Sequence, residues 1–199
     1  NNYIWIKHLL GNSFRFLFSF SLLIIMMGFV FSKHILMTIS TPDYLNHALY
    51  TYTSQDVLWV VLLVLGFYFI SALFNYIFIA SKNESVLLKI NIFITIFNII
   101  GNIIFIPQYS FMWAAYVTLV SQILLFILWA YFSRKIISFE FPKKYIVWNM
   151  LGTGVIFWIW SVLIEKIQFG WLAEMFLIGG VLFVLYIFMM WIFYYEEIK

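Results

Sequence analysis

Polar side chains recur at helical spacing within one apolar stretch of this chain. Asn91, Thr95, Asn98 and Asn102 are separated by four, three and four residues, so on a helix they fall within an arc of about 60°. Amides and hydroxyls on one such face either hydrogen-bond to a neighbouring helix or line a polar cavity. We expect Asn91, Thr95 and Asn98 to lie on a substrate pathway, and Asn102, beside Gly101, to pack against the next helix.

A second face of small side chains follows on the next apolar segment. Ala114, Thr118 and Ser121 are spaced by four and three residues, and small residues in this pattern let two helices approach closely. The segments are joined by Pro107–Ser110, a connection short enough to make them antiparallel neighbours. The pattern therefore predicts that Ala114, Thr118 and Ser121 pack against the asparagine-bearing helix.

Neither catalytic nor metal chemistry is indicated. The three histidines are scattered without ligand spacing, there is no cysteine, and no phosphate-binding glycine loop occurs. No Ser/His/Asp set or pair of carboxylates converges at one depth. Glu174 is the one carboxylate inside a predicted span, and it lies near the start of that span. We predict no catalytic residue, no metal ligand and no cofactor, and we do not expect an enzyme.

The composition indicates an integral membrane protein. Of 199 residues, 65% are hydrophobic and 10% charged, whereas a soluble domain has about 25% charged residues. Too few charged groups remain to cover a surface that faces water. The 11 basic residues are spread along the chain, so they do not form a nucleic-acid-binding patch.

Six segments are long enough to cross a bilayer as helices, which takes about 20 apolar residues. Their apolar runs are continuous rather than alternating, which excludes a β-barrel. The sequence therefore predicts an all-α membrane protein with helices at residues 16–36, 57–80, 86–106, 111–132, 145–164 and 171–195.

Basic residues predict the orientation of these helices. If the N-terminus is cytoplasmic, nine of the eleven lysines and arginines fall on the cytoplasmic side and only Lys33 and Lys166 fall outside. We therefore expect both termini in the cytoplasm, with residues 133–144 forming a basic cytoplasmic loop. Thr41-Pro42 is a helix start signal, and we expect a short interfacial helix at residues 44–50.

The block from Leu73 to Ser121 carries a family resemblance. It contains the asparagine-rich helix, then Ile106-Pro107-Gln108-Tyr109-Ser110, then Ala114-Ala115, and then a helix with Thr118 and Ser121. This order resembles the C-terminal half of polysaccharide flippases of the multidrug/oligosaccharidyl-lipid/polysaccharide exporter superfamily. In that family an Ile-Pro-x-Tyr-Gly turn precedes Gly-Ala-Ala, so Ser110 and Trp113 replace two of the usual glycines.

The resemblance implies a transporter of 12–14 helices in two lobes around a central cavity. Residues 1–132 would supply four helices of the C-terminal lobe, and residues 145–199 an additional helix pair. The missing N-terminal helices of the same protein would complete the cavity. Such proteins flip polyprenyl-diphosphate-linked oligosaccharide across the cytoplasmic membrane by alternating access, for cell-surface polysaccharide synthesis. The implied partners are the lipid-linked saccharide and membrane lipid.

Other functions stay open at this point. The chain would also fit a non-transporting membrane scaffold or subunit, in which the asparagine stripe is only a packing seam. A multidrug or ion-coupled exporter of the same superfamily is another possibility. A membrane-embedded lipid-modifying enzyme is disfavoured, because no acid/base constellation is visible.

Overall fold

The computed structural model describes residues 2–40, 52–137, 141–164, 180–181, 183–184 and 186–188. The ordered elements within this part of the chain are helices: α1 Asn2–Ile39, α2 Ser54–Ala80, α3 Glu84–Tyr109, α4 Phe111–Ile136 and α5 Lys143–Ile164. The described residues between 180 and 188 are also helical. The predicted interfacial helix at 44–50, Glu174 and most of the predicted helix at 171–195 lie outside the described residues.

Four of these helices are long and apolar enough to cross a membrane. They are α1 from Trp5 to Ile39, α2, α3 and α4, and each has at least 26 residues. At about 1.5 Å per residue, 26 residues span about 39 Å, more than the roughly 30 Å hydrocarbon layer. For the described residues, the prediction of an all-helical protein with membrane-length helices is confirmed, while the count of six spans stays a prediction.

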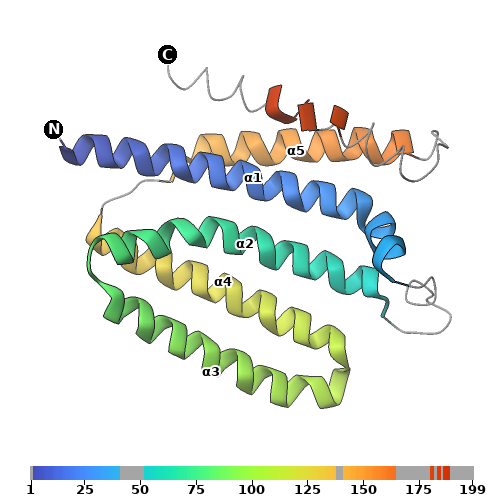
Figure 1. Ribbon diagram of the computed structural model, residues 1–199, viewed down its shortest axis with the longest axis horizontal. Helices are drawn as coiled ribbons and strands as arrows, with labels where there is room; N and C mark the ends of the chain where they lie inside the picture. Colours follow the sequence, from blue (N-terminus) through green and yellow to red (C-terminus); the bar gives the residue numbers. More distant parts are fainter. Residues whose placement is uncertain are drawn as a thin grey trace.

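The helices form an open row rather than a closed bundle (Figure 1). The row runs α5, α1, α2, α4 and α3, because α1 packs between α5 and α2, and α4 packs between α2 and α3. Helix α3 lies at the end of this row, and only Ile90 and Ile94 of its side chains are buried. Its other faces expose large apolar residues, including Phe93, Ile96 and Ile103.

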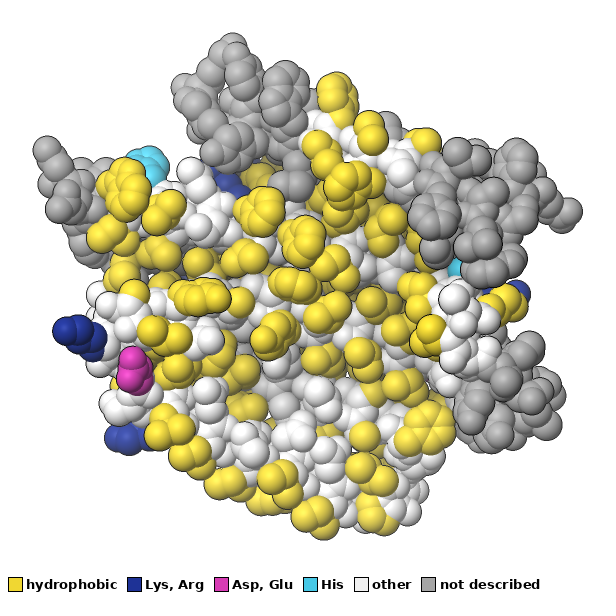
Figure 2. Space-filling view, viewed as in Figure 1, with side chains coloured by type: hydrophobic (Ala, Val, Ile, Leu, Met, Phe, Trp, Pro, Cys, Tyr) yellow, Lys and Arg dark blue, Asp and Glu magenta, His cyan; other side chains and the backbone are white. Residues whose placement is uncertain are grey.

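In Figure 2 hydrophobic side chains are spread over the described part of the face, and the charged side chains lie near its edges. Between α1 and α2 two glycines permit close approach. A Cβ at Gly28 would lie 2.4 Å from Leu62, and one at Gly66 would lie 2.4 Å from Ile25. Because glycine has no side chain, the two helices can pack closely at these positions. Dispersion attraction between the closely packed atoms then stabilises the contact.

Several helix ends differ from the prediction. Helix α1 begins at Asn2 rather than near residue 16, because hydropathy locates the start of the apolar stretch and the preceding polar residues are also compatible with a helix. Helix α4 continues to Ile136, so Arg134 and Lys135 lie in its last turn, where positive charge favours the helix dipole. The predicted basic loop at 133–144 is correspondingly shorter.

The predicted Pro107–Ser110 loop is wrong. Helix α3 continues through Pro107 to Tyr109, and α4 begins at Phe111. A proline in the last turn removes only one backbone hydrogen bond, so it does not have to end the helix. The turn between α3 and α4 is therefore Ser110 alone.

Local sequence also fixes both ends of α2. Thr53 is the N-cap residue, just ahead of the first turn. Its backbone N–H and its hydroxyl both donate to the Asp56 carboxylate at 2.8 Å, as in a capping box. At its C-terminus, Asn83 N–H donates to the Phe78 carbonyl and Lys82 N–H donates to that of Ile79. This is a Schellman motif with Lys82 in the left-handed conformation, at φ 57°.

Candidate functional site

A chain of polar side chains connects α3 to α4. The side-chain amide of Asn102 donates to Asn98 Oδ1 at 2.9 Å, and the Asn98 amide donates to Ser121 Oγ at 3.0 Å. The Ser121 hydroxyl then donates to the Val117 carbonyl at 2.7 Å. Ser121 is buried, and the two asparagines are half-buried. Asn98 is thus the central member, bonded to both Asn102 and α4.

The Val117 side chain of α4 packs closely against Gly101 of α3 beside this chain. A Cβ placed on Gly101 would lie 2.8 Å from Val117 Cγ1, which is shorter than van der Waals contact. The turn between the helices places Ser110 at φ 73° and ψ −179°, a region that essentially only glycine occupies without strain. The hairpin therefore combines a glycine contact, a strained one-residue turn and a half-buried amide bonded to a buried hydroxyl.

The remaining residues of the two predicted faces lie in varied environments. Asn91 is half-buried and Thr95 is exposed on α3. Thr118 is exposed, and its hydroxyl donates to the Ala114 carbonyl of the same helix at 2.8 Å. The structure brings together Asn98, Asn102 and Ser121, and it adds Val117, which the spacing argument did not select. The pathway role of Asn91, Thr95 and Asn98, and the packing role of Ala114 and Thr118, stay predictions.

A second polar network, which the sequence analysis missed, joins α1 to α5 and to Tyr186. Ser19 Oγ lies 2.7 Å from the Tyr145 hydroxyl and accepts a hydrogen bond from Asn149 Nδ2 at 2.6 Å. The Tyr186 hydroxyl donates to the Ser19 carbonyl at 2.5 Å and lies 3.2 Å from Asn149 Oδ1. All four side chains are at most 2% exposed. The sequence indicates this network only through Asn149 and Thr153, two polar residues spaced four apart in α5.

An apolar cavity of about 260 Å³ adjoins this network between α1, α2 and α5. Thr153 lines it, and its hydroxyl donates to the Asn149 carbonyl rather than into the cavity. The rest of the lining is Leu22, Ile25, Met26, Phe29, Leu63, Gly154 and Phe157. This surface has no polar group with which to orient a reacting substrate.

A third polar contact joins the C-terminal part of α1 to the N-terminal part of α2. The Ser32 hydroxyl, 1% exposed, accepts hydrogen bonds from Gln55 Nε2 at 2.9 Å and from Trp59 Nε1 at 3.1 Å. The Trp59 ring also stacks on Phe29 with the ring centroids 5.8 Å apart. This contact fixes the relative position of the two helices where α1 approaches its C-terminus and α2 begins.

The groups in these contacts are neutral amides, hydroxyls and an indole. They hold helices together and can bind polar groups, but they do not supply a nucleophile with an adjacent base. Among the residues that the structure describes, no group of three histidine, aspartate or glutamate side chains is placed to hold a metal ion.

Comparison with known proteins gave no relative. No protein-family model matches the sequence, and neither the curated proteins nor the solved structures include a match.

Proposed function

We propose that this chain forms part of a membrane transporter that flips polyprenyl-diphosphate-linked oligosaccharide across the cytoplasmic membrane. The observation that carries the proposal is the α3–α4 hairpin. Its sequence resembles the flippase pattern, and Ser110, which replaces the glycine of that pattern, has the backbone conformation that glycine favours. A turn that needs this conformation gives a physical reason for glycine in the family motif.

The open row of helices supports a role within a larger assembly. Helix α3 exposes apolar side chains over most of its surface, which in a lobed transporter would face lipid or further helices of the same protein. Asn91 and Thr95 lie on the same helix, within two turns of Asn98. In a two-lobed transporter, amides and hydroxyls at these positions would provide hydrogen-bond partners for sugar hydroxyls.

The test is transport by the full-length protein in a flippase-deficient strain. We expect Asn91→Leu and Thr95→Val to lower surface polysaccharide and to cause lipid-linked saccharide to accumulate, while expression and thermal stability in detergent stay close to wild type. Ser85→Ala, an exposed position at the start of α3, is the control. Wild-type transport in both variants would contradict the pathway role of this face, and failure of the wild-type protein to restore polysaccharide would contradict the function.

A second candidate is a non-transporting membrane scaffold. The observation that favours it is the Asn98–Ser121 hydrogen bond, because an amide used to join two helices does not require a substrate. The same assay separates the two functions, since a scaffold alone would not restore surface polysaccharide to a flippase-deficient strain.

A further inference from the structure

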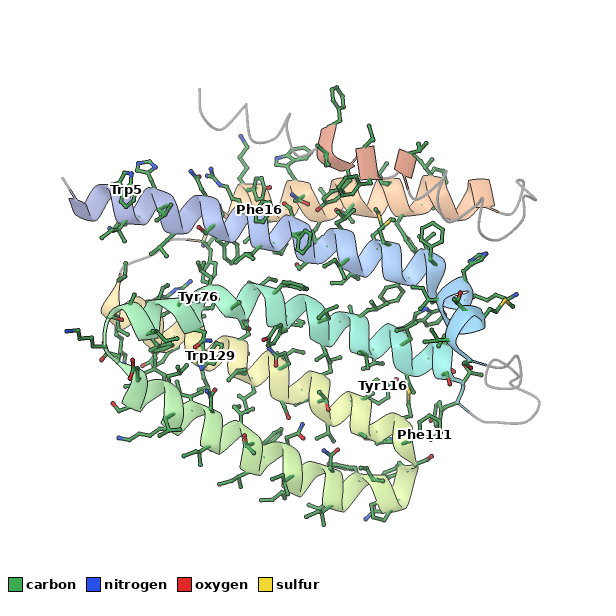
Figure 3. All side chains as sticks on the ribbon, viewed as in Figure 1. Trp5, Phe16, Tyr76, Phe111, Tyr116 and Trp129 are labelled. Carbon is green, nitrogen blue, oxygen red and sulfur yellow. The ribbon has the colours of Figure 1, made fainter. Side chains whose placement is uncertain are left out.

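A groove lies between α1 and α2, at the end of the molecule where α1 begins and α2 ends. Its volume is about 640 Å³, within the range of about 300–1,000 Å³ that is usual for small-molecule sites. In Figure 3, Phe16 on α1 and Tyr76 on α2 lie in the half of the molecule that contains the start of α1 and the end of α2. The lining consists of Asn12, Ser13, Phe16, Leu17, Leu73 and Tyr76.

The groove has an apolar floor and a polar edge. Leu73 is buried, whereas Phe16 and Tyr76 are 61% and 69% exposed. Asn12 and Ser13 lie nearer the start of α1 and bring an amide and a hydroxyl, each able to donate hydrogen bonds. A ligand seated here would contact aromatic and aliphatic surface on one side and hydrogen-bond donors on the other.

Aromatic packing borders the groove toward the middle of the helices. Phe20 follows Phe16 by one turn, and its ring meets Phe69 edge-on with the ring centroids 5.4 Å apart. Phe69 in turn precedes Leu73 by one turn of α2. This aromatic pair therefore packs between α1 and α2 next to the groove, on its side toward the middle of the helices.

The depth of the groove matches the boundary between hydrocarbon and headgroups. The midpoint of α2 is near Phe67, and Leu73 and Tyr76 lie about 9 and 14 Å from it along the helix at 1.5 Å per residue. Half of the hydrocarbon layer is about 15 Å. If α2 crosses a membrane centrally, Leu73 lies within the hydrocarbon layer and Tyr76 lies close to its boundary with the headgroup region.

The described charged side chains at this end are mostly basic. Among the described residues Glu84 is the only carboxylate at the end where α1 and α5 begin, whereas the basic side chains there are Lys7, Arg15, Lys82, Lys89, Arg134, Lys135, Lys143 and Lys144. The groove lining itself carries no charge, and the Arg15 guanidinium, in the same turn of α1, lies over the Tyr145 ring of α5 at 5.7 Å from its centre. Basic residues near a membrane surface attract anionic lipid headgroups without lining the site directly.

We propose that the α1–α2 groove is a binding site for an anionic phospholipid of the bilayer. The Asn12 and Ser13 side chains and the Tyr76 hydroxyl donate hydrogen bonds to the phosphate and glycerol oxygens. Phe16 and Leu73 contact the start of the acyl chains, and the lysines and arginines at this end of the helices favour negative over zwitterionic headgroups. This site is independent of the proposed transport function, because it requires only that α1 and α2 lie in a membrane.

The test measures which lipid the protein retains. The full chain, purified in a mild neutral detergent, is mixed with equal amounts of phosphatidylglycerol and phosphatidylcholine, and the bound lipids are counted by native mass spectrometry. We expect a preference for phosphatidylglycerol of about fivefold, which corresponds to the attraction of about one basic residue, and we expect salt to weaken it. Equal retention of the two lipids would overturn the proposal.

Variants locate the preference in the groove. Asn12→Ala/Ser13→Ala removes both polar side chains without adding bulk, and Ser13→Trp fills the groove; each should abolish most of the preference. Ser85→Trp makes the same substitution at an exposed position near the start of α3 and should retain it. If Ser13→Trp does not fold, the double alanine variant decides. A preference unchanged in that variant would place the lipid elsewhere and overturn the assignment.

Discussion

Asn149 on α5 and Ser19 on α1 are joined by a side-chain hydrogen bond of 2.6 Å, and both residues are fully buried. The two lie 130 positions apart in the sequence. Ser19 also bonds to Tyr145, and Asn149 lies within hydrogen-bond distance of Tyr186. The α1–α5 contact therefore depends on a saturated polar network in addition to apolar packing, and such a network is costly to break in part.

Replacing Asn149 by leucine should destabilise the α1–α5 contact. Asn149→Leu removes the hydrogen bonds to Ser19 and Tyr186, and the expected loss of folding free energy is about 1–3 kcal/mol. The measurement is reversible unfolding in detergent or lipid micelles. Asn91→Leu, at a half-buried position on α3, is the matched control and should change stability by less than about 0.5 kcal/mol. Equal effects of the two substitutions would show that the network contributes little.

The left-handed turn at Ser110 should be relieved by glycine. At φ 73° and ψ −179°, a residue with a Cβ is strained by about 1–3 kcal/mol. Ser110→Gly should therefore raise the unfolding temperature, whereas Ser110→Ala keeps the Cβ and should not. Thermal unfolding of the three proteins in the same detergent is the measurement. If alanine stabilises as much as glycine, the backbone conformation at this turn is not the cause.

The close contact of Gly101 with Val117 predicts a steric effect. Gly101→Ala places a Cβ 2.8 Å from Val117 Cγ1, and valine in a helix has little freedom to move away. We expect a loss of about 1–3 kcal/mol, which Val117→Ala in the same molecule should partly restore. Gly154→Ala is the control, because nothing lies within 4 Å of its added Cβ, and it should be neutral or stabilising by up to about 1 kcal/mol. Absence of rescue would contradict the steric explanation.

The sequence predicted the helices well because their apolar runs exceed the length of a membrane span. It predicted the helix ends less well, since hydropathy does not detect the polar first turns of α1 or the passage of α3 through Pro107. The stripe from Asn91 to Asn102 identified one polar contact between helices. The Ser19–Asn149–Tyr186 network could not be found in the same way, because its members come from three distant segments and only the packing of α5 on α1 brings them together.

Surface labelling should establish the orientation on this cysteine-free background. Ser85, Lys143 and Thr38 are exposed, the first two at the end where α3 and α5 begin and the third at the opposite end. In intact cells, a membrane-impermeant thiol reagent should modify Thr38→Cys and leave Ser85→Cys and Lys143→Cys unmodified until the cells are opened. The reverse pattern would invert the predicted topology.

The central position of Asn98 predicts an order of effects within the α3–α4 contact. Asn98→Leu removes the hydrogen bond to Ser121 and the one from Asn102, whereas Asn102→Leu removes only the second. We therefore expect Asn98→Leu to be the more destabilising change, with each lost bond worth about 0.6–1.7 kcal/mol in a membrane protein. A double-mutant cycle of Asn98→Leu with Ser121→Ala, measured by unfolding in detergent, should give a coupling energy of the same size.

The same variants test whether Asn98 also serves the substrate pathway. If it only joins the helices, transport by the full-length protein should fall in proportion to the folded fraction, and Ser121→Ala should behave in the same way. A loss of transport in Asn98→Leu that exceeds its loss of folded protein would place the amide on the pathway as well. A coupling energy near zero would instead show that the Asn98–Ser121 hydrogen bond does not stabilise the hairpin.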